Sequence, residues 1–232
     1  MVPISFADEE MRLVGGRALF WPREGALVVA DLHLEKASHY ARTGQMLPPY
    51  DSRETLGRVA QAIRETGARR VFALGDSFHD AQGCERLEPH AAGMLAALTR
   101  AVDWVWIAGN HDGEVADAGR TGGDWVDEML LGGIALRHEA RAGETGAEIS
   151  GHFHPKLSVT ARGRRIARPC AVVAASDHGT ARMILPAFGA LTGGLDAGAL
   201  AIRAAMQPAR SIDALVPVAG RLARYPVWRE AA

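Results

Sequence analysis

Four apolar segments of this chain each run directly into residues with oxygen or imidazole side chains. The segments 26–30, 71–74, 104–108 and 149–150 are followed by Asp31-Leu32-His33, Gly75-Asp76, Gly109-Asn110-His111-Asp112 and Gly151-His152-Phe153-His154. An apolar run that ends in a glycine and a carboxylate is how an α/β protein presents a ligand at the carboxyl edge of its sheet. The repetition predicts one site assembled from four strand ends.

Helical patterns separate the first three of these segments. Residues 52–66 and 89–100 carry apolar side chains at helical spacing, and both predict amphipathic helices. Asp51 and Glu54 predict a capping box at the start of the first helix, and Gly67 predicts its end. Strands that alternate with helices predict a largely parallel sheet with right-handed connections, covered by those helices.

Two further stretches of the first half are less regular. Gly15-Gly16 predicts a two-residue hairpin turn between strands at 11–14 and 17–21. The polar stretch 35–44 is too irregular to predict a helix.

The second half of the chain predicts a second sheet with mostly antiparallel pairing. Short strands separated by glycine-containing turns are expected at 133–138, 147–150, 157–160, 165–167 and 171–175. Arg162-Gly163-Arg164 predicts a hairpin turn, residues 195–206 predict a helix, and the tail beyond Pro208 is weakly patterned.

The chain shows no internal repeat, low-complexity tract or long linker. We therefore expect one α/β domain, 1–232, that contains two sheets. The metal-site core is expected at about 26–154, and the remaining strands and helix at 155–232.

Composition narrows the classes of function. The net charge is −1, so the whole chain lacks the strongly basic character that is typical of many nucleic-acid-binding proteins. Cys84 and Cys170 are the only cysteines and predict free thiols in a reducing compartment. The N-terminus has no leader pattern and no apolar run reaches the ~20 residues that span a bilayer, so we expect a cytoplasmic protein without a membrane partner.

Seven side chains are candidate metal ligands: Asp31, His33, Asp76, Asn110, His138, His152 and His154. Oxygen and imidazole donors without a thiolate suit Mn²⁺, Fe, Zn²⁺ or Mg²⁺. Seven ligands exceed what one such ion takes from a protein, so two ions that share a carboxylate fit better, ~3.5–4 Å apart. Strand alternation predicts that the paired ligands in D-x-H and H-x-H each point the same way.

The ordered set D-x-H, G-D, G-N-H-D, a lone His and G-H-x-H resembles the signature of the calcineurin-like metallophosphoesterases, over residues 26–154. The resemblance implies a four-layer sandwich of two mixed β-sheets with helices outside. By position, one ion would be held by Asp31, His33 and His154. The second would be held by Asn110, His138 and His152, and Asp76 would bridge the two.

One motif departs from part of that family. The protein phosphatases carry G-D-x-x-D-R-G, whereas this chain has Gly75-Asp76-Ser77-Phe78-His79-Asp80-Ala81 and lacks the phosphate-binding arginine. This departure favours the nuclease and phosphodiesterase branch, which carries G-D-x-x-H.

Three segments, 31–36, 47–51 and 185–194, resemble the bacterial ligase-associated DNA damage response endonuclease group. Its members are encoded beside a helicase and a DNA ligase and are described as manganese-dependent phosphodiesterases. The resemblance implies two Mn²⁺ ions, a phosphodiester substrate such as DNA or RNA, and a role in DNA repair. The segment 185–194 also fits a plain turn between a strand and a helix.

The remaining polar residues of the motifs suggest catalytic roles. Two cations would supply hydroxide near neutral pH and neutralise the phosphoryl oxygens. His111 is the candidate general acid for the leaving alkoxide, and either His79 or Asp112 would hold its tautomer. Lys36 would contact a phosphate oxygen, or it is a solvated surface lysine.

Two other functions remain open at this point. One is a small-molecule phosphomonoesterase or nucleotide pyrophosphatase. The other is a non-catalytic scaffold that binds a partner protein, which the retention of all seven ligands and His111 disfavours. The basic cluster Arg162, Arg164, Arg165 and Arg168 either guides a phosphate backbone or forms a solvated hairpin face.

Overall fold

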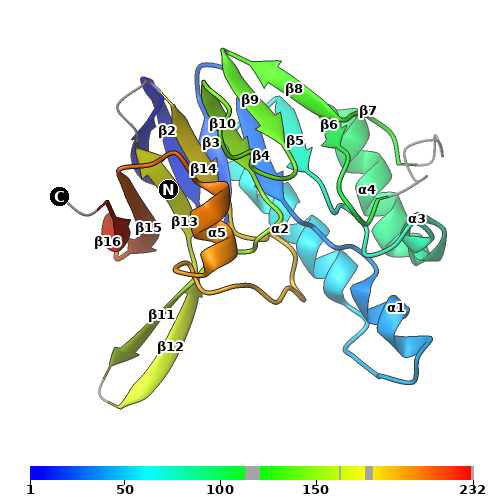
Figure 1. The fold of residues 1–232 in the computed structure, drawn as a ribbon. Helices are drawn as coiled ribbons and strands as arrows, with labels where there is room; N and C mark the ends of the chain where they lie inside the picture. Colours follow the sequence, from blue (N-terminus) through cyan, green and yellow to red (C-terminus); the bar gives the residue numbers. More distant parts are fainter. Residues whose placement is uncertain (113–120, 162, 176–179, 231–232) are drawn as a thin grey trace.

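The computed structural model describes residues 1–112, 121–161, 163–175 and 180–230 of the chain (Figure 1). Its first sheet follows the order β1-β2-β3-β4-β5-β6-β7. These strands are β1 (Val2–Phe6), β2 (Glu9–Val14), β3 (Ala18–Trp21), β4 (Ala26–Ala30), β5 (Arg70–Leu74), β6 (Asp103–Ile107) and β7 (Asp124–Val126). Pairing is antiparallel from β1 to β4 and parallel from β4 to β7.

The second sheet follows the order β16-β15-β13-β14-β10-β9-β8. Its strands are β8 (Glu128–Leu131), β9 (Ile134–Arg137), β10 (Ala147–Ser150), β13 (Ala171–Ala175), β14 (Ala181–Ile184), β15 (Ser211–Val218) and β16 (Arg221–Arg229). In this sheet β10 runs parallel to both β9 and β14, and the other pairs are antiparallel.

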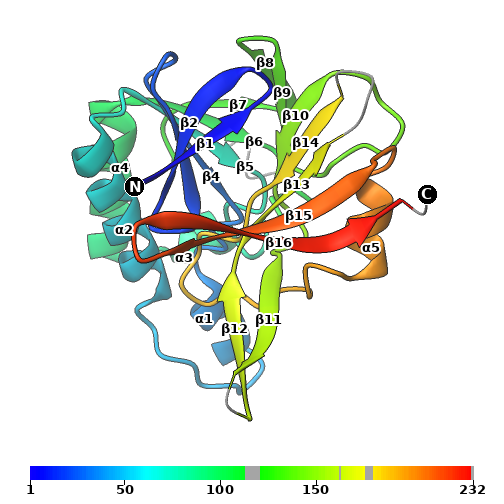
Figure 2. The same cartoon turned by 90° about the vertical axis from the view of Figure 1, so that its left-hand side faces the viewer.

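Four layers result from the burial of apolar faces. One core joins the two sheets and includes Phe72 from the first and Met183 from the second. The other face of the first sheet is covered by α2 (Asp51–Thr66) and α4 (Pro89–Ala101). The outer face of the second sheet is covered by α5 (Leu200–Ala205), whose Ile202 is buried against it (Figure 2). The predicted four-layer α/β sandwich is confirmed.

Two short helices complete the elements: α1 (Lys36–Ala41) and α3 (Gly83–Arg86). The stretch that holds α1 was expected to be irregular, and the helix spans six residues of it. Among the described residues, no helix has the length and apolar character needed to cross a membrane.

The helix predicted at 52–66 is confirmed, but its predicted start is wrong. Gly67 ends α2 in the left-handed conformation, and its N–H donates to Ile63 at 2.8 Å. Asp51 forms no capping box, because it already lies in the first turn. Its carboxylate instead accepts the Ala37 N–H of α1 at 3.1 Å.

The hairpin between β2 and β3 has a longer loop than predicted. Val14 pairs with Ala18, so Arg17 joins Gly15 and Gly16 in a three-residue loop. The Arg17 N–H donates to the Val14 carbonyl at 3.2 Å, which closes it.

Two predictions for the C-terminal part are also wrong. Residues 157–160 and 165–167 do not enter the second sheet, since β11 (Lys156–Ala161) and β12 (Arg164–Pro169) form a separate two-stranded sheet. The helix expected at 195–206 begins only at Leu200, because residues 195–197 exchange backbone hydrogen bonds with Lys156. The weakly patterned tail forms the two long strands β15 and β16.

Candidate metal centre

The candidate ligands follow five strands whose carboxyl ends meet between the two sheets. Asp31 and His33 follow β4, Asp76 follows β5 and Asn110 follows β6, which are neighbouring parallel strands. From the second sheet, where β9 and β10 are also parallel, the ligands that follow are His138, His152 and His154. Parallel neighbours bring residues distant in sequence to one edge, as expected from the motifs.

The backbone at these ligands is left-handed, which corrects the argument from strand alternation. The φ angles are positive for Asp31, His33, Asp76, His152 and His154, at 51°, 43°, 45°, 71° and 47°. Non-glycine residues rarely adopt this region, and each costs of order 1–3 kcal/mol. The ligands therefore lie in tight turns after the strands, where a period of two no longer sets their direction.

Hydrogen bonds between the ligand loops hold this strained backbone. The His33 N–H donates to the Asp76 carbonyl at 2.9 Å, and the His152 N–H donates to the Asp31 carboxylate at 3.0 and 3.1 Å. The His111 N–H donates to Asp76 Oδ1 at 3.0 Å. The carboxylates of Asp31 and Asp76 thus connect the ligand loops through hydrogen bonds within the protein, and the bond from His152 to Asp31 links the two sheets.

One group of donors consists of Asp31, His33, Asp76 and His154, with one ligand atom of each within 4.8 Å of the others. His33 Nε2 lies 3.2 Å from His154 Nε2, and the latter lies 3.5 Å from Asp31 Oδ1. Burial, reinforced by the neighbouring His154 and Lys36, lowers the pKa of His33 to about 2. His33 is therefore a neutral imidazole, which is the form that binds metal.

A second group consists of Asp76, His138 and His152, so Asp76 belongs to both. His138 Nε2 lies 3.5 Å from Asp76 Oδ1 and 3.1 Å from His152 Nδ1. His138 Nδ1–H donates to the Leu74 carbonyl at 3.3 Å, which leaves Nε2 with its lone pair facing the group. Asn110 lines the same hollow of about 230 Å³ as His138.

Two motif glycines make this convergence sterically possible. A Cβ on Gly75, which has φ +67°, would lie 2.1 Å from His138 Nδ1. A Cβ on Gly109 would lie 2.1 Å from the Asp76 nitrogen. Both positions exclude a side chain because another ligand residue occupies its place.

The donor sets fit two divalent cations. Each group offers carboxylate oxygens and imidazole nitrogens that converge on one point, and His33 Nε2 and His154 Nε2 lie 3.2 Å apart. Carboxylate oxygens and imidazole nitrogens are ligands that divalent cations take in proteins.

The proposed catalytic residues have different surroundings. The His111 side chain is 48% exposed, and its ring stacks on His79 with centroids 5.4 Å apart. Asp112 is fully buried, and its carboxylate accepts the N–H groups of Phe78 and Gly109 at 3.0 and 2.9 Å. Burial raises the pKa of Asp112 to about 6. Asp112 thus ties the G-D loop to the G-N-H-D loop, whereas His79 contacts the His111 ring directly.

Lys36 begins α1 and is partly buried. Burial lowers its pKa, and the nearby Asp51 opposes that shift. Burial lowers the pKa of His79 to about 4, and the positive charge of Lys36 adds to that shift, as it does for His33.

Several residues around the site carry no sequence signal. His39 Nδ1 lies 2.5 Å from Asp80 Oδ2, and Arg86 donates twice to the same carboxylate at 2.8 Å. Although burial opposes ionisation, these hydrogen bonds lower the pKa of Asp80 to about 2.

Glu139 also carries no signal in the sequence. Its Oε1 lies 3.8 Å from His152 Nε2, whereas the other ring nitrogen of His152, Nδ1, faces His138. A carboxylate in that position orients a metal-binding imidazole.

The segment 185–194 also supports the ligand loops. The Phe188 N–H donates to Ala30 at 2.8 Å and the Gly189 N–H donates to Asp31 at 3.2 Å. Arg17 donates to the carbonyls of Ala187 and Gly189 at 3.0 and 3.1 Å. The segment thus connects β14 with α5 and also fixes the backbone of the D-x-H turn by hydrogen bonds.

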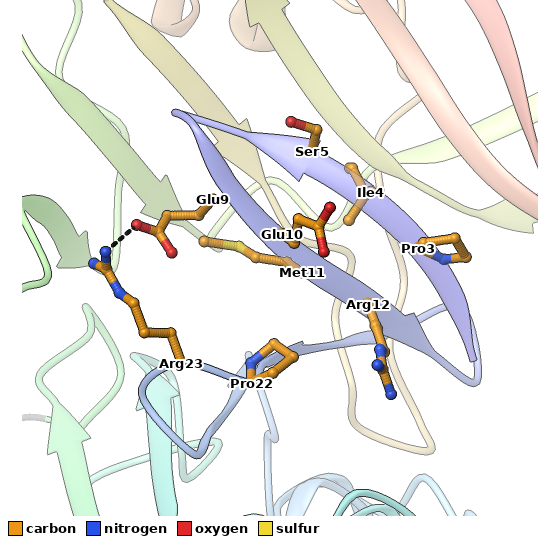
Figure 3. A pocket seen from close by; sticks show the side chains of 9 residues that line it. All are labelled: Pro3, Ile4, Ser5, Glu9, Glu10, Met11, Arg12, Pro22 and Arg23. Atoms are coloured by element: carbon orange, nitrogen blue, oxygen red, sulfur yellow. Dashed lines mark ion pairs between the residues drawn. The ribbon is translucent and has the colours of Figure 1, made fainter.

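A different hollow, of about 550 Å³, lies over β1 and β2 (Figure 3). Its charged side chains are Glu9, Glu10, Arg12 and Arg23, and Arg23 pairs with Glu9 at 2.6 Å. It contains none of the candidate ligands, so it is separate from the metal centre.

One solved structure is similar to this chain over nearly its whole length. The chain is similar to the Pseudomonas putida nuclease MPE in its crystal structure, with 28% identity and a TM-score of 0.70 over 97% of this chain and 98% of that one. The E. coli phosphoesterase Yfce is similar at 16% identity and a TM-score of 0.45, over 88% of this chain and 99% of its own. No curated protein matched the chain.

The family described as Calcineurin-like phosphoesterase matches residues 26–156, which is more than half of the chain. The match covers the ligand turns after β4, β5, β6, β9 and β10. This chain therefore belongs to the calcineurin-like phosphoesterase family of metal-dependent hydrolases.

Proposed function

We propose that the protein is a phosphodiesterase that hydrolyses nucleic acid with two divalent cations. The observation that carries the proposal is the position of Asp76 in both donor groups. A carboxylate shared by two clusters of candidate ligands suits two divalent cations held close together, as in two-metal hydrolases.

The proposed ligands keep the division between the two groups. Asp31, His33 and His154 would hold one ion, Asn110, His138 and His152 the other, and Asp76 would bridge them. When bound, two such cations lower the pKa of a water molecule and neutralise charge on the phosphoryl oxygens. Mn²⁺ is the proposed metal, and Fe, Zn²⁺ and Mg²⁺ share the same preference for oxygen and imidazole donors.

His111 is the proposed general acid. Its ring is accessible to a substrate, unlike the buried imidazole of His33. Its backbone N–H donates to Asp76 Oδ1 at 3.0 Å, and its ring Nε2 lies 3.9 Å from Asp76 Oδ2. His79 positions the His111 ring by stacking, and Asp112 fixes the loop that carries it. Lys36 holds a phosphate oxygen of the substrate.

Nucleic acid is the proposed substrate for two reasons. The Pseudomonas putida protein, similar over nearly its whole length, is a nuclease. The segments 31–36, 47–51 and 185–194 resemble the ligase-associated endonuclease group. By the same resemblance we propose a cytoplasmic role in DNA repair, in association with a helicase and a DNA ligase.

Diesters are expected to be better substrates than monoesters. Position 80 is Asp where the phosphatases have a phosphate-binding arginine, and Arg86 is held by this Asp80 through two hydrogen bonds. A monoester dianion therefore lacks its usual guanidinium partner. The measurement is kcat/KM with Mn²⁺ for bis(4-nitrophenyl) phosphate and for 4-nitrophenyl phosphate.

The same preparation of an Asp76→Asn variant controls for contaminating phosphatases. Higher kcat/KM for the monoester would favour the small-molecule phosphomonoesterase and would overturn the proposed function.

A further inference from the structure

Strands β11 and β12 form a hairpin that extends away from both large sheets (Figures 1 and 2). We call it the basic hairpin, residues 156–169. Its strands pair antiparallel from Lys156 with Pro169 onwards, and at ~3.3 Å per residue each is about 20 Å long. In both views it extends from the same side of the molecule as α1, which begins with Lys36.

The base of the basic hairpin directly follows a candidate ligand in the chain and is held by backbone hydrogen bonds. β11 begins two residues after the candidate ligand His154. The Lys156 N–H donates to Leu195 at 2.8 Å, and the Cys170 N–H donates to Pro155 at 3.1 Å. The hairpin therefore starts at the reactive site and leads away from it.

The strands of the hairpin are unusually exposed. Five of the six residues of β12 are exposed. Val159 and Ile166, which face each other in the register, are 37% and 39% exposed. An isolated two-stranded hairpin is marginally stable in water, so an uncovered one is typical of a surface that binds a partner.

The charge of this hairpin identifies the kind of partner. Residues 156–169 contain five basic side chains and no acidic one, although the whole chain has a net charge of −1. Arg162 lies outside the described residues. Within the described part of the chain, Arg164, Arg165 and Arg168 form no ion pair, and Arg165 donates to Ser158 at 3.3 Å.

Strand alternation places Arg164 and Arg168 on the same face as Val159 and Ile166. A face that combines free guanidinium groups with aliphatic side chains suits a polymer with a charged backbone and apolar bases.

We propose that the basic hairpin binds the sugar-phosphate backbone of a single nucleic-acid strand whose scissile phosphate lies at the metal centre. This inference rests on the proposed function, and it assigns the substrate-binding surface of that same site.

The test compares two triple variants with equal loss of charge. The hairpin variant carries Arg164→Ala, Arg165→Ala and Arg168→Ala. The control carries Arg12→Ala, Arg64→Ala and Arg100→Ala, which are exposed positions on β2, α2 and α4. Binding of a fluorescein-labelled 30-nucleotide single strand is measured by anisotropy across a range of salt concentrations.

The hairpin variant is expected to bind at least ~10-fold more weakly than the wild type. Three lost phosphate contacts should also reduce the slope of log K against log salt by about 2, at ~0.7 per contact for single strands. Its kcat/KM for a single-stranded polynucleotide should fall relative to that for bis(4-nitrophenyl) phosphate, which lacks a flanking backbone. The control variant should bind as the wild type does.

Equal affinity of the two variants, or a parallel fall of both kcat/KM values, would overturn the role of the hairpin. A wild type that hydrolyses the small diester but binds no strand would overturn it too. A wild type that binds the strand through the hairpin but cleaves no polynucleotide would contradict the proposed function and leave the hairpin as the binding surface.

Discussion

Replacing Asp76 with Asn is expected to remove nearly all diester hydrolysis. Asp76 is the one residue common to both donor groups, and an amide cannot supply two anionic oxygens to two cations. Losing a single preorganised donor costs ~10²–10³-fold in rate, so weakening two sites at once should cost more than ~10³-fold. The measurements are kcat/KM for bis(4-nitrophenyl) phosphate and the metal content of the purified variant.

Asn110→Ala is the matched comparison for this variant. Asn110 lines the hollow beside His138 and belongs to the proposed second set alone. This variant should mainly lose one ion, whereas Asp76→Asn should lose both. Equal metal loss in the two variants would contradict the bridging role of Asp76.

Replacing His111 with Ala is expected to lower the rate without lowering metal content. The contact of His111 with Asp76 at hydrogen-bond distance is made by the backbone N–H, which alanine keeps. Loss of a general acid typically costs ~10²–10⁴-fold. That loss should appear in full on an alkyl diester, whose alkoxide needs a proton, and should be smaller on a nitrophenyl diester, since nitrophenolate leaves unprotonated.

The pattern across the two substrates distinguishes the roles of His111. Equal losses on both, with full metal content, would make His111 a residue that positions the phosphate. A fall in metal content would make it a ligand.

The sequence predicted that these strand ends converge, because its motifs follow directly on buried strands. The buried strands β4, β5 and β6 are continuous apolar runs, and each is followed by a polar turn. The family relationship supplied the pairing of Asp31 with His154 across 123 positions of chain, which no local pattern contains.

The geometry of the ligands was not predictable from periodicity. The left-handed turns at Asp31 and His33 are held by hydrogen bonds to Gly75 and Asp76 from the neighbouring loop. Such long-range contacts override the alternation of an extended strand. For the same reason, the contact of Glu139 with His152 could not be predicted, since it depends on β9 and β10 lying side by side.

Other misses also reflect tertiary context. β15 and β16 were unrecognised because β16 is largely exposed and lacks regular alternation. Asp51 and Glu54 matched a capping box, but the Asp51 carboxylate accepts a hydrogen bond from Ala37 of α1 instead. The treatment of residues 1–232 as one domain stays a prediction.

The most direct test of the two-metal site is a count of its ions. The protein is saturated with Mn²⁺, desalted and analysed for metal per chain, and the same sample is assayed with bis(4-nitrophenyl) phosphate. About two ions per chain, with diester hydrolysis that is lost on chelation and restored by Mn²⁺, is the predicted result. One ion or none per chain under these conditions, or hydrolysis that survives chelation, would contradict it.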